Sequence, residues 1–346
     1  MSSSGKAGSK SAPTMSDVAR LAGVSAMTVS RALRHDGAVS QKTRDKVLAV
    51  VDELGYVPDQ AAGALSSGRS SLVGMIAPAL VNPIFGMVAR GLNDTLTPLG
   101  LQLFIGFSDY GAEREEHMLE SMLRRRPEAI AIAGEIRSER ATRMLLNAGV
   151  PVVEFLHRPA EPIRHVVAID HVAVGRAVAQ HFVQSGRKRL AAIIGRERLT
   201  SNTTDRAEGL REGARQAGLA PVRLISAGGP LALAEQGVRA AAEIIENLAE
   251  IDAVLCPHDI TAIAVIGELR RRGARVPDDI AVFGFGDHEV ARHTLPALTT
   301  IGFNAGLMGV EIGKLMINAF EASRLGQDAA PFNVTLDFEV IVRDSA

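Results

Sequence analysis

The chain has 346 residues, of which 47% are hydrophobic and 22% are charged, and its formal net charge is −1. These values are ordinary for a soluble globular protein of two or three domains. The single cysteine, Cys256, excludes a disulfide framework and a multi-cysteine metal site. The sequence contains no apolar run of about 18 residues, so it predicts no membrane span.

The first 13 residues are rich in Ser, Gly and Lys, and we expect them to form a disordered arm. They lack the apolar segment of a secretion signal, so the expected location is the cytoplasm. Residues 1–72 contain nine Lys and Arg against six Asp and Glu, whereas the rest of the chain contains 29 against 33. A basic head on an acidic body is compatible with nucleic-acid binding, although an asymmetry this small is common.

Residues 14–58 are predicted to form three helices and no strand. Side chains that favour the N-cap mark where each helix begins, and a glycine marks where the first and the third helix end. The predicted helices span residues 15–22, 26–34 and 41–54, with Thr14, Ser25 and Ser40 as N-caps and Gly23 and Gly55 as stops.

The first two helices have the residue pattern of a helix-turn-helix. The small Ala19 lets the helices approach closely, Gly23 turns the chain, and the β-branched Val29 fills the junction. Helical geometry places Val29, Ala32 and Leu33 on one side of the second helix. The other side is left free and carries Ala26, Met27, Ser30, Arg31 and Arg34.

This free side has the composition of a DNA-recognition helix. Such a helix enters the major groove with its N-terminal residues at the base edges. Arg31 can donate two hydrogen bonds to guanine, while Ser25, Thr28 and Ser30 can hold phosphates. The alternative is a solvated face on a plain three-helix bundle.

From residue 72 onward, short apolar runs alternate with amphipathic stretches, which predicts βαβ units with parallel sheets. One strand-helix pattern recurs at an offset of 118 residues, around Gly91 and Gly209. Two similar lobes would enclose a ligand cleft at the carboxyl ends of both sheets. The predicted strands are residues 72–77, 102–107, 129–133, 152–155, 166–169, 190–194, 222–225, 253–257 and 280–285, and the predicted helices are residues 84–99, 114–125, 172–185, 203–217, 233–247, 260–272 and 305–321.

Enzyme motifs are weak in this chain. Gly284 and Gly286 begin a G-x-G pattern, but Glu289 stands in the place of the third glycine, and neither a P-loop nor a nucleophile elbow is present. Cys256 is expected to be a buried thiol rather than a nucleophile. We therefore expect no catalytic residue, no metal and no cofactor. The remaining candidate ligands, His171, His181, His288 and His293, lack supporting residues and are expected to be solvated or capping histidines.

Several motifs of the head and the body are shared with one known family. The head contains TMSDVARLAGVS at residues 14–25, TVSRAL at 28–33 and LGYVP at 54–58. The body contains NPIF at residues 82–85, GRKR at 186–189, VPDD at 276–279 and PALTTI at 296–301. These motifs resemble the LacI/GalR family of transcriptional regulators, and the resemblance covers nearly the whole chain after residue 13.

The resemblance implies an α/β fold with a small all-α helix-turn-helix head and a two-lobed, periplasmic-binding-protein-like body with parallel sheets. Ala26, Met27 and Arg31 would read bases, and Met27 would make an apolar contact, for instance to a thymine methyl group. Within a hinge over residues 59–70, residues 59–67 would become helical only on operator DNA, where Leu65 would wedge between base steps of the minor groove. The expected DNA contacts are Thr14, Ser16, Ser25, Ala26, Met27, Thr28, Ser30, Arg31, Arg34, Ser40 and Leu65.

The resemblance also implies that the chain crosses between the lobes three times. The first lobe would contain about residues 71–169 and 300–328, and the second about residues 170–299 and 329–346. An effector would change how the lobes close or rotate, which displaces the hinges from their DNA-bound geometry. Two heads must reach the two halves of a palindromic operator, so a homodimer is expected.

A sugar acid such as gluconate is the expected effector. By resemblance Arg206 binds ligand hydroxyl groups or a carboxylate, and a planar guanidinium suits a carboxylate. Many family members carry Gly-Tyr-Asp where this chain has Gly-Phe-Gly at residues 284–286, so a negative charge beside Arg206 is missing. The Gly-Phe-x-x-His pattern that ends at His288 is similar to that of gluconate-responsive members. The expected effector contacts are Asn82, Phe85, Arg206, His258, Asp259 and Asp287.

The sequence therefore predicts a sequence-specific DNA-binding repressor of a carbohydrate or sugar-acid catabolic operon, controlled by a small-molecule effector. Its partners would be double-stranded operator DNA, the effector and a second copy of the chain, with no membrane. The second hypothesis for the effector is a neutral sugar, with Asp287 turned inward in place of the missing Asp. For the whole protein, two further hypotheses are a two-lobed sugar-binding protein and a sugar-modifying enzyme with an accessory DNA-binding head.

Overall fold

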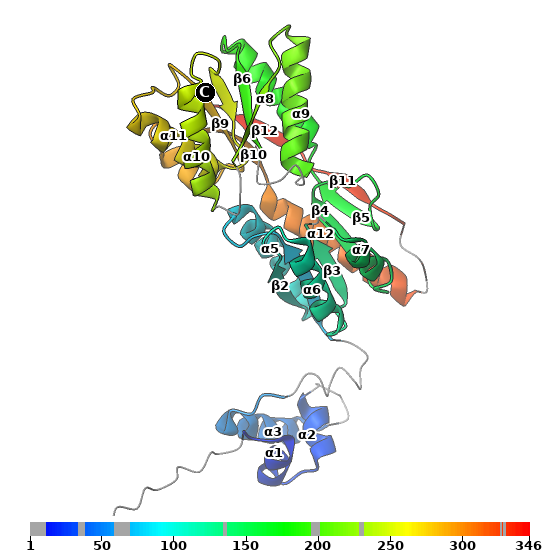
Figure 1. The fold of residues 1–346 in the computed structure, drawn as a ribbon. Coiled ribbons are helices and arrows are strands. Elements are labelled where there is room, and N and C mark those ends of the chain that lie inside the picture. The colour runs from blue at the N-terminus through cyan, green and yellow to red at the C-terminus, as the bar shows by residue number, and fades with distance from the viewer. Residues whose placement is uncertain are drawn as a thin grey trace, which may run out of the picture. The chain divides into compact units, whose positions relative to one another are not determined.

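The computed structural model describes residues 12–33, 39–58, 70–133, 137–194, 201–227, 232–325, 327 and 330–346 (Figure 1). The chain divides between Ser70 and Ser71 into two compact units, a head and a body. The expected arm up to residue 11, the expected hinge over residues 59–69 and the candidate DNA contacts Arg34 and Leu65 lie outside the described residues.

The head contains three short helices, α1 (Met15–Ala22), α2 (Ala26–Leu33) and α3 (Gln41–Leu54), which begin where the N-caps predict. In a reciprocal capping box, Thr14 Oγ1 accepts from the Asp17 backbone at 3.3 Å and the Asp17 carboxylate accepts from the Thr14 backbone at 3.0 Å. Gly23 has a φ of 63°, which lets the chain turn directly from α1 toward α2. The helices enclose a small apolar core of Val18, Ala19, Ala22, Val29, Ala32, Val39, Val47 and Tyr56.

The body contains two six-stranded sheets, one in each lobe, with the order β11-β5-β4-β3-β1-β2 in the first and β12-β10-β9-β8-β6-β7 in the second. Paired strands are parallel except β10 and β12, so the predicted parallel α/β architecture is confirmed. The strands are β1 (Leu72–Ala77), β2 (Gln102–Phe107), β3 (Ala129–Ile132), β4 (Val152–Leu156), β5 (His165–Ala168), β6 (Leu190–Ile194), β7 (Arg223–Ser226), β8 (Ala253–Leu255), β9 (Ala281–Phe285), β10 (Thr299–Phe303), β11 (Asn333–Thr335) and β12 (Phe338–Ile341).

Helices pack beside the sheets in pairs: α5 with α12 and α6 with α7 in the first lobe, α8 with α9 and α10 with α11 in the second (Figure 1). No helix among the described residues is both long and apolar enough to cross a bilayer. The helices are α5 (Pro83–Leu96), η1 (Thr97–Leu99), α6 (Ala112–Leu123), α7 (Glu139–Leu146), α8 (His171–Gln184), α9 (Ser201–Gln216), α10 (Leu233–Glu246), α11 (Asp259–Arg271), η2 (Glu289–His293) and α12 (Ala305–Arg324).

The chain crosses between the lobes three times, but two crossings lie later than expected. β10 pairs with β9 and β12 in the second lobe, whereas β11 pairs with β5 in the first. The boundary expected near residue 300 therefore moves to Asn304, and the boundary expected near residue 328 moves to the segment between β11 and β12. Both of these strands are short and lie at sheet edges, and none of their side chains is buried, so they lack the continuous buried apolar run that marks the central strands.

Each lobe contains a close helix contact of the same kind, and this accounts for the repeat in the sequence. Where α5 meets α12, a Cβ on Gly91 would lie 2.0 Å from the carbonyl oxygen of Gly306. Where α8 meets α9, a Cβ on Gly209 would lie 2.0 Å from the carbonyl oxygen of Val172. Glycine at both positions lets the helices touch backbone to backbone, which no other residue permits without movement.

Gly209→Ala should therefore destabilise the body, because the added methyl group must push α9 away from α8. We expect a loss of about 1–3 kcal/mol in the free energy of unfolding, measured by urea denaturation. Gly267→Ala in α11 is the matched control, since the nearest atom to its Cβ would be Arg271 Nη1 at 3.9 Å. That variant should be as stable as the parent or up to about 1 kcal/mol more stable. Equal stability of the two variants would contradict the close helix contact.

Candidate functional site

On α2, exposed and buried residues divide as the helical wheel predicts. Val29 and Ala32 are fully buried in the core of the head, whereas Met27 is 61% exposed. Ala26 and Arg31 are also exposed. The outer side of α2 therefore presents a guanidinium and two small or flexible apolar side chains to a partner.

The candidates that carry hydroxyl groups lie at and near helix N-termini. Ser25 Oγ accepts from the Thr28 backbone at 3.1 Å, and Ser40 Oγ accepts from the Thr43 backbone at 3.3 Å. A capped helix N-terminus with its positive dipole end is a favourable place for a phosphate oxygen. Thr14, Ser16, Ser25 and Ser40 are exposed, and Thr28 and Ser30 are half-buried.

In the body, the guanidinium of Arg206, which lies on α9 and is 2% exposed, contacts His171, Pro257 and Phe285. Nη1 donates to His171 Nδ1 at 3.0 Å, and Nη2 donates to the Pro257 carbonyl oxygen at 3.1 Å. The Cζ atom lies 4.0 Å from the centre of the Phe285 ring. Pro257 follows β8 and Phe285 ends β9, so Arg206 lies at the carboxyl edge of the second sheet, where a ligand of an α/β protein binds.

His171 is a neutral imidazole with a defined tautomer. Nε2 lies 3.0 Å from the Leu156 carbonyl oxygen, which can only accept, so Nε2 carries the proton and Nδ1 accepts from Arg206. Burial, and then the charge of Arg206, lowers the pKa of His171 well below its usual range. The expectation of a solvated or capping histidine is wrong here, because His171 is 3% exposed. Its place three residues after β5, beyond the carboxyl end of a strand, is the sequence signal that could have found it.

Asn82 and His258 meet across the two lobes. Asn82 is the N-cap of α5, and its Nδ2 lies 3.5 Å from His258 Nδ1. Burial, followed by the charge of Arg206, lowers the pKa of His258 to about 3, so this imidazole is neutral. Phe85 is buried and packs edge-on against Phe155, with 6.4 Å between the ring centres, as part of the first lobe's core.

Asp259 and Asp287, expected as effector contacts, instead bind groups of their own lobe. Asp259 is fully buried, and its carboxylate accepts from the Thr300 hydroxyl group at 2.5 Å and from the His288 backbone at 2.7 Å. Asp287 accepts from Arg343 Nη2 at 2.6 Å. These bonds tie α11 and the segment after β9 to β10 and the C-terminal segment. Asp287 is therefore paired with Arg343 rather than turned inward in place of the missing Asp.

Sequence reasoning missed a cross-lobe pair beside Arg206. His157 directly follows β4 in the first lobe, and its Nδ1 lies 3.7 Å from a carboxylate oxygen of Asp205 on α9. A cavity of about 250 Å³ adjoins this pair and is lined by His157, Arg158, Ile169, Asp170, His171, Val172, Asp205 and Thr335. It shares His171 with the surroundings of Arg206, so a ligand can reach both lobes there.

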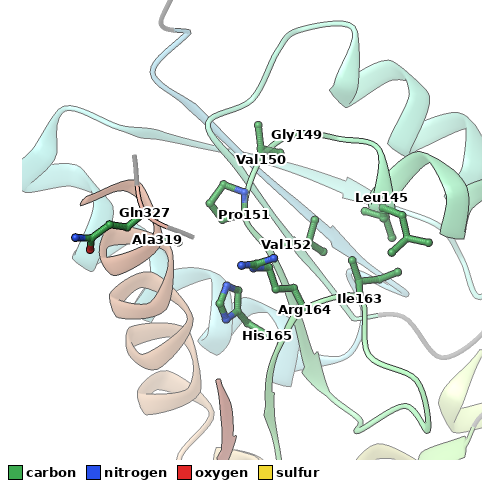
Figure 2. Close-up of a pocket in the computed structure, with 11 residues that line it drawn as sticks. Leu145, Gly149, Val150, Pro151, Val152, Ile163, Arg164, His165, Ala319 and Gln327 are labelled. Atoms are coloured by element: carbon green, nitrogen blue, oxygen red, sulfur yellow. The ribbon is translucent and has the colours of Figure 1, made fainter. Parts of the chain in front are cut away.

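A larger cavity of about 360 Å³ lies in the first lobe, between the end of α7, the start of β4 and the end of α12 (Figure 2). Val152, His165 and Ala319 are among its lining residues, and none of the expected effector contacts is. It lies at the amino ends of β4 and β5 in the first sheet, whereas Arg206 lies at the carboxyl edge of the second sheet. This cavity therefore lies away from the expected effector contacts.

A further cluster of buried charges lies in the first lobe. Glu154, in β4, is 1% exposed and accepts from Arg137 Nη2 at 2.7 Å and from the Ile163 backbone at 2.6 Å. Glu115, on α6, is 4% exposed. Burial raises the pKa of Glu115 to about 7, and the charge of Arg137 only partly opposes this shift.

Glu115→Gln should remove a pH-dependent loss of stability. In an unfolded chain this carboxyl group ionises near pH 4.5, whereas in the folded body its pKa is about 7. The folded state binds the proton more tightly than the unfolded chain does. The resulting stabilisation of the folded state is complete below pH 4.5 and is lost as the pH rises through 7. Glutamine imitates the protonated carboxyl group. We expect the variant to be about 2–3 kcal/mol more stable than the parent at roughly pH 8 and equally stable at about pH 4, by urea denaturation. A difference that is the same at both pH values would contradict the raised pKa.

Both the head and the body match models of known protein families. Residues 14–59 match the model described as bacterial regulatory proteins, lacI family, and residues 179–346 match that of a periplasmic binding protein-like domain. The HTH-type transcriptional regulator GntR of Pseudomonas aeruginosa is 32% identical over 334 residues, which cover 96% of this chain and 95% of that protein. The crystal structure of a LacI-family transcriptional regulator from Silicibacter pomeroyi is similar with a TM-score of 0.84 and 33% identity, over 96% of this chain and 99% of that one. A complex of the transcriptional regulator CelR with cellobiose is similar with a TM-score of 0.70 and 27% identity, over 96% and 100% of the two chains.

Proposed function

The chain belongs to the lacI family of bacterial transcriptional regulators, and we propose that it is a homodimeric repressor released from its operator by a sugar acid such as gluconate. The similar proteins are regulators rather than enzymes, and the head sets this chain apart from a plain sugar-binding protein. The observation that carries the choice of effector is the buried guanidinium of Arg206 at the carboxyl edge of the second sheet, where it contacts His171, Pro257 and Phe285.

On the DNA side, we assign base reading to the exposed side of α2, with Arg31 on a guanine and Met27 on an apolar base edge. The helix N-termini at Ser25 and Ser40 would hold phosphates. Residues 59–70 would form the hinge, with Leu65 in the minor groove. Two heads in a homodimer would bind the halves of a palindrome, in the cytoplasm where the operator is.

On the effector side, the groups that fix Arg206 favour an anion. His171 and His258 are held neutral, so neither competes for a carboxylate nor neutralises one. Gly286 replaces the Asp of many family members, so the site lacks one negative charge that would repel an acid. A guanidinium and a carboxylate form two parallel, charge-assisted hydrogen bonds, which are stronger than bonds between neutral groups. The similarity to the GntR regulator is compatible with this branch of the family.

Calorimetric titration of the full chain tests the proposal. The ligands are gluconate, related aldonates and uronates, and neutral sugars of matching hydroxyl pattern. At least one acid should bind, and the same acid should release operator DNA. If none of the acids binds, the proposed effector class is refuted.

A neutral sugar is the second candidate effector. The similarity to the CelR–cellobiose structure favours it, and so does the carboxyl group of Asp205, which lines the cavity beside His157 and His171. A carboxylate beside Arg206 can accept hydrogen bonds from sugar hydroxyl groups. Binding and operator release by a neutral sugar alone would establish this candidate.

A further inference from the structure

His288 is a buried imidazole whose two ring nitrogens have no hydrogen-bond partner among the described residues. The residue is 4% exposed and its side chain makes no cap hydrogen bond, contrary to the expectation of a solvated or capping histidine. An unpaired buried polar group costs about 1–3 kcal/mol, so native proteins rarely retain one without a function or a bound partner. An imidazole with two unpaired nitrogens next to a ligand site is therefore a candidate for a ligand contact.

The backbone holds this ring in place. The His288 N–H donates to an Asp259 carboxylate oxygen at 2.7 Å, and the His288 carbonyl oxygen accepts from the Ala291 backbone at 2.8 Å. The ring lies over Gly286, where a Cβ would be only 2.8 Å from Nε2. Gly286 also has a φ of 127°, which other residues rarely adopt. The imidazole of His288 thus occupies the space that a side chain at position 286 would fill.

His288 and Arg206 both lie close to the segments that carry His258 and Phe285. The His288 N–H donates to Asp259, which follows His258 in the chain, and the Arg206 guanidinium lies over the ring of Phe285, three residues before His288. Burial lowers the pKa of His288 itself, while Asp259 and Asp287 oppose the shift, which keeps the ring neutral at ordinary pH. A neutral imidazole has one N–H donor and one acceptor nitrogen.

We infer that His288 hydrogen-bonds a hydroxyl group of the effector that binds beside Arg206. This inference rests on the effector site proposed above. A hydroxyl group can both donate and accept, which matches the two nitrogens of the ring, whereas a carboxylate can only accept. Arg206 would therefore select the carboxylate and His288 the hydroxylated carbon chain. A polyhydroxy acid satisfies both residues, and a short acid without hydroxyl groups satisfies only Arg206.

The test compares His288→Leu with the parent, using gluconate as the probe. Without ligand, the variant should unfold at the same temperature as the parent or higher, because no hydrogen bond between ring and protein is lost. Its affinity for gluconate should fall at least about tenfold, the equivalent of one hydrogen bond. His288→Gln keeps a donor and an acceptor and should recover part of the affinity.

His181→Leu is the matched control. The Nε2 of His181 is also buried without a partner among the described residues, but its ring packs 5.5 Å from that of Phe283 in the core of the second lobe. This variant should keep full affinity for gluconate. A parent that discriminates against one monodeoxy gluconate, and a His288→Leu variant that does not, would identify the hydroxyl group concerned.

Two results overturn the inference: an unchanged affinity of His288→Leu for gluconate, or a lower unfolding temperature of the unliganded variant with a matching loss in His288→Gln. If no acid binds the parent, the proposed effector class fails, and the same variants are titrated with the neutral sugar that binds. A loss of at least about tenfold in His288→Leu then still supports hydroxyl recognition, and an unchanged affinity refutes it.

Discussion

Arg31→Ala should abolish specific operator binding while the head stays folded. The side chain is exposed on α2, so the substitution removes no core contact. One bidentate contact to guanine contributes about 1–3 kcal/mol, and a dimer on a palindrome loses two such contacts. Fluorescence anisotropy at fixed salt, with a palindromic duplex selected from a random library, measures this loss.

Arg31→Lys separates base reading from charge. Lysine keeps the charge but not the planar pair of donors, so it should lose specificity while non-specific binding stays near that of the parent. Arg215→Ala, an exposed arginine on α9 in the body, controls for the change in net charge and should bind like the parent. Operator affinity of Arg31→Ala equal to that of the parent would remove Arg31 from the base-reading set.

Arg206→Ala should produce a repressor that binds its operator but no longer responds to the effector. Loss of one partner from a buried, hydrogen-bonded charge pair costs about 2–5 kcal/mol, so we expect affinity for the acid to fall about 30-fold or more. Titration calorimetry measures the affinity, and operator anisotropy with added acid measures the response.

The variant also leaves His171 Nδ1 without its donor, so its folding must be checked separately. Arg176→Ala on α8 is the control, because Arg176 is exposed and pairs with Glu212 in the same lobe. It should bind the acid like the parent. A folded Arg206→Ala variant that keeps the acid affinity would show that the carboxylate lies elsewhere.

The local chemistry of the head made it predictable from sequence. The N-caps Thr14, Ser25 and Ser40 and the stops Gly23 and Gly55 act within a few residues, so these five helix boundaries are encoded beside the helices. The strands of the lobe centres were equally accessible, because they are continuous apolar runs.

The details of the effector site depend on residues far apart in the chain. Arg206 meets His171 from the end of one strand and Pro257 from the end of another, and no local pattern encodes this meeting. Asp287 next to the missing Asp suggests a substitute role, but Arg343 reaches it from the C-terminal segment. The sequence around His288 suggests a surface histidine until the gap left by Gly286 is known.

Operator anisotropy with and without gluconate, for the parent and for Arg206→Ala, tests most directly whether an acid bound at Arg206 releases the DNA. We predict that gluconate lowers the operator affinity of the parent and leaves that of the variant unchanged. Release by gluconate in both proteins, or in neither, would contradict control through this residue by a sugar acid.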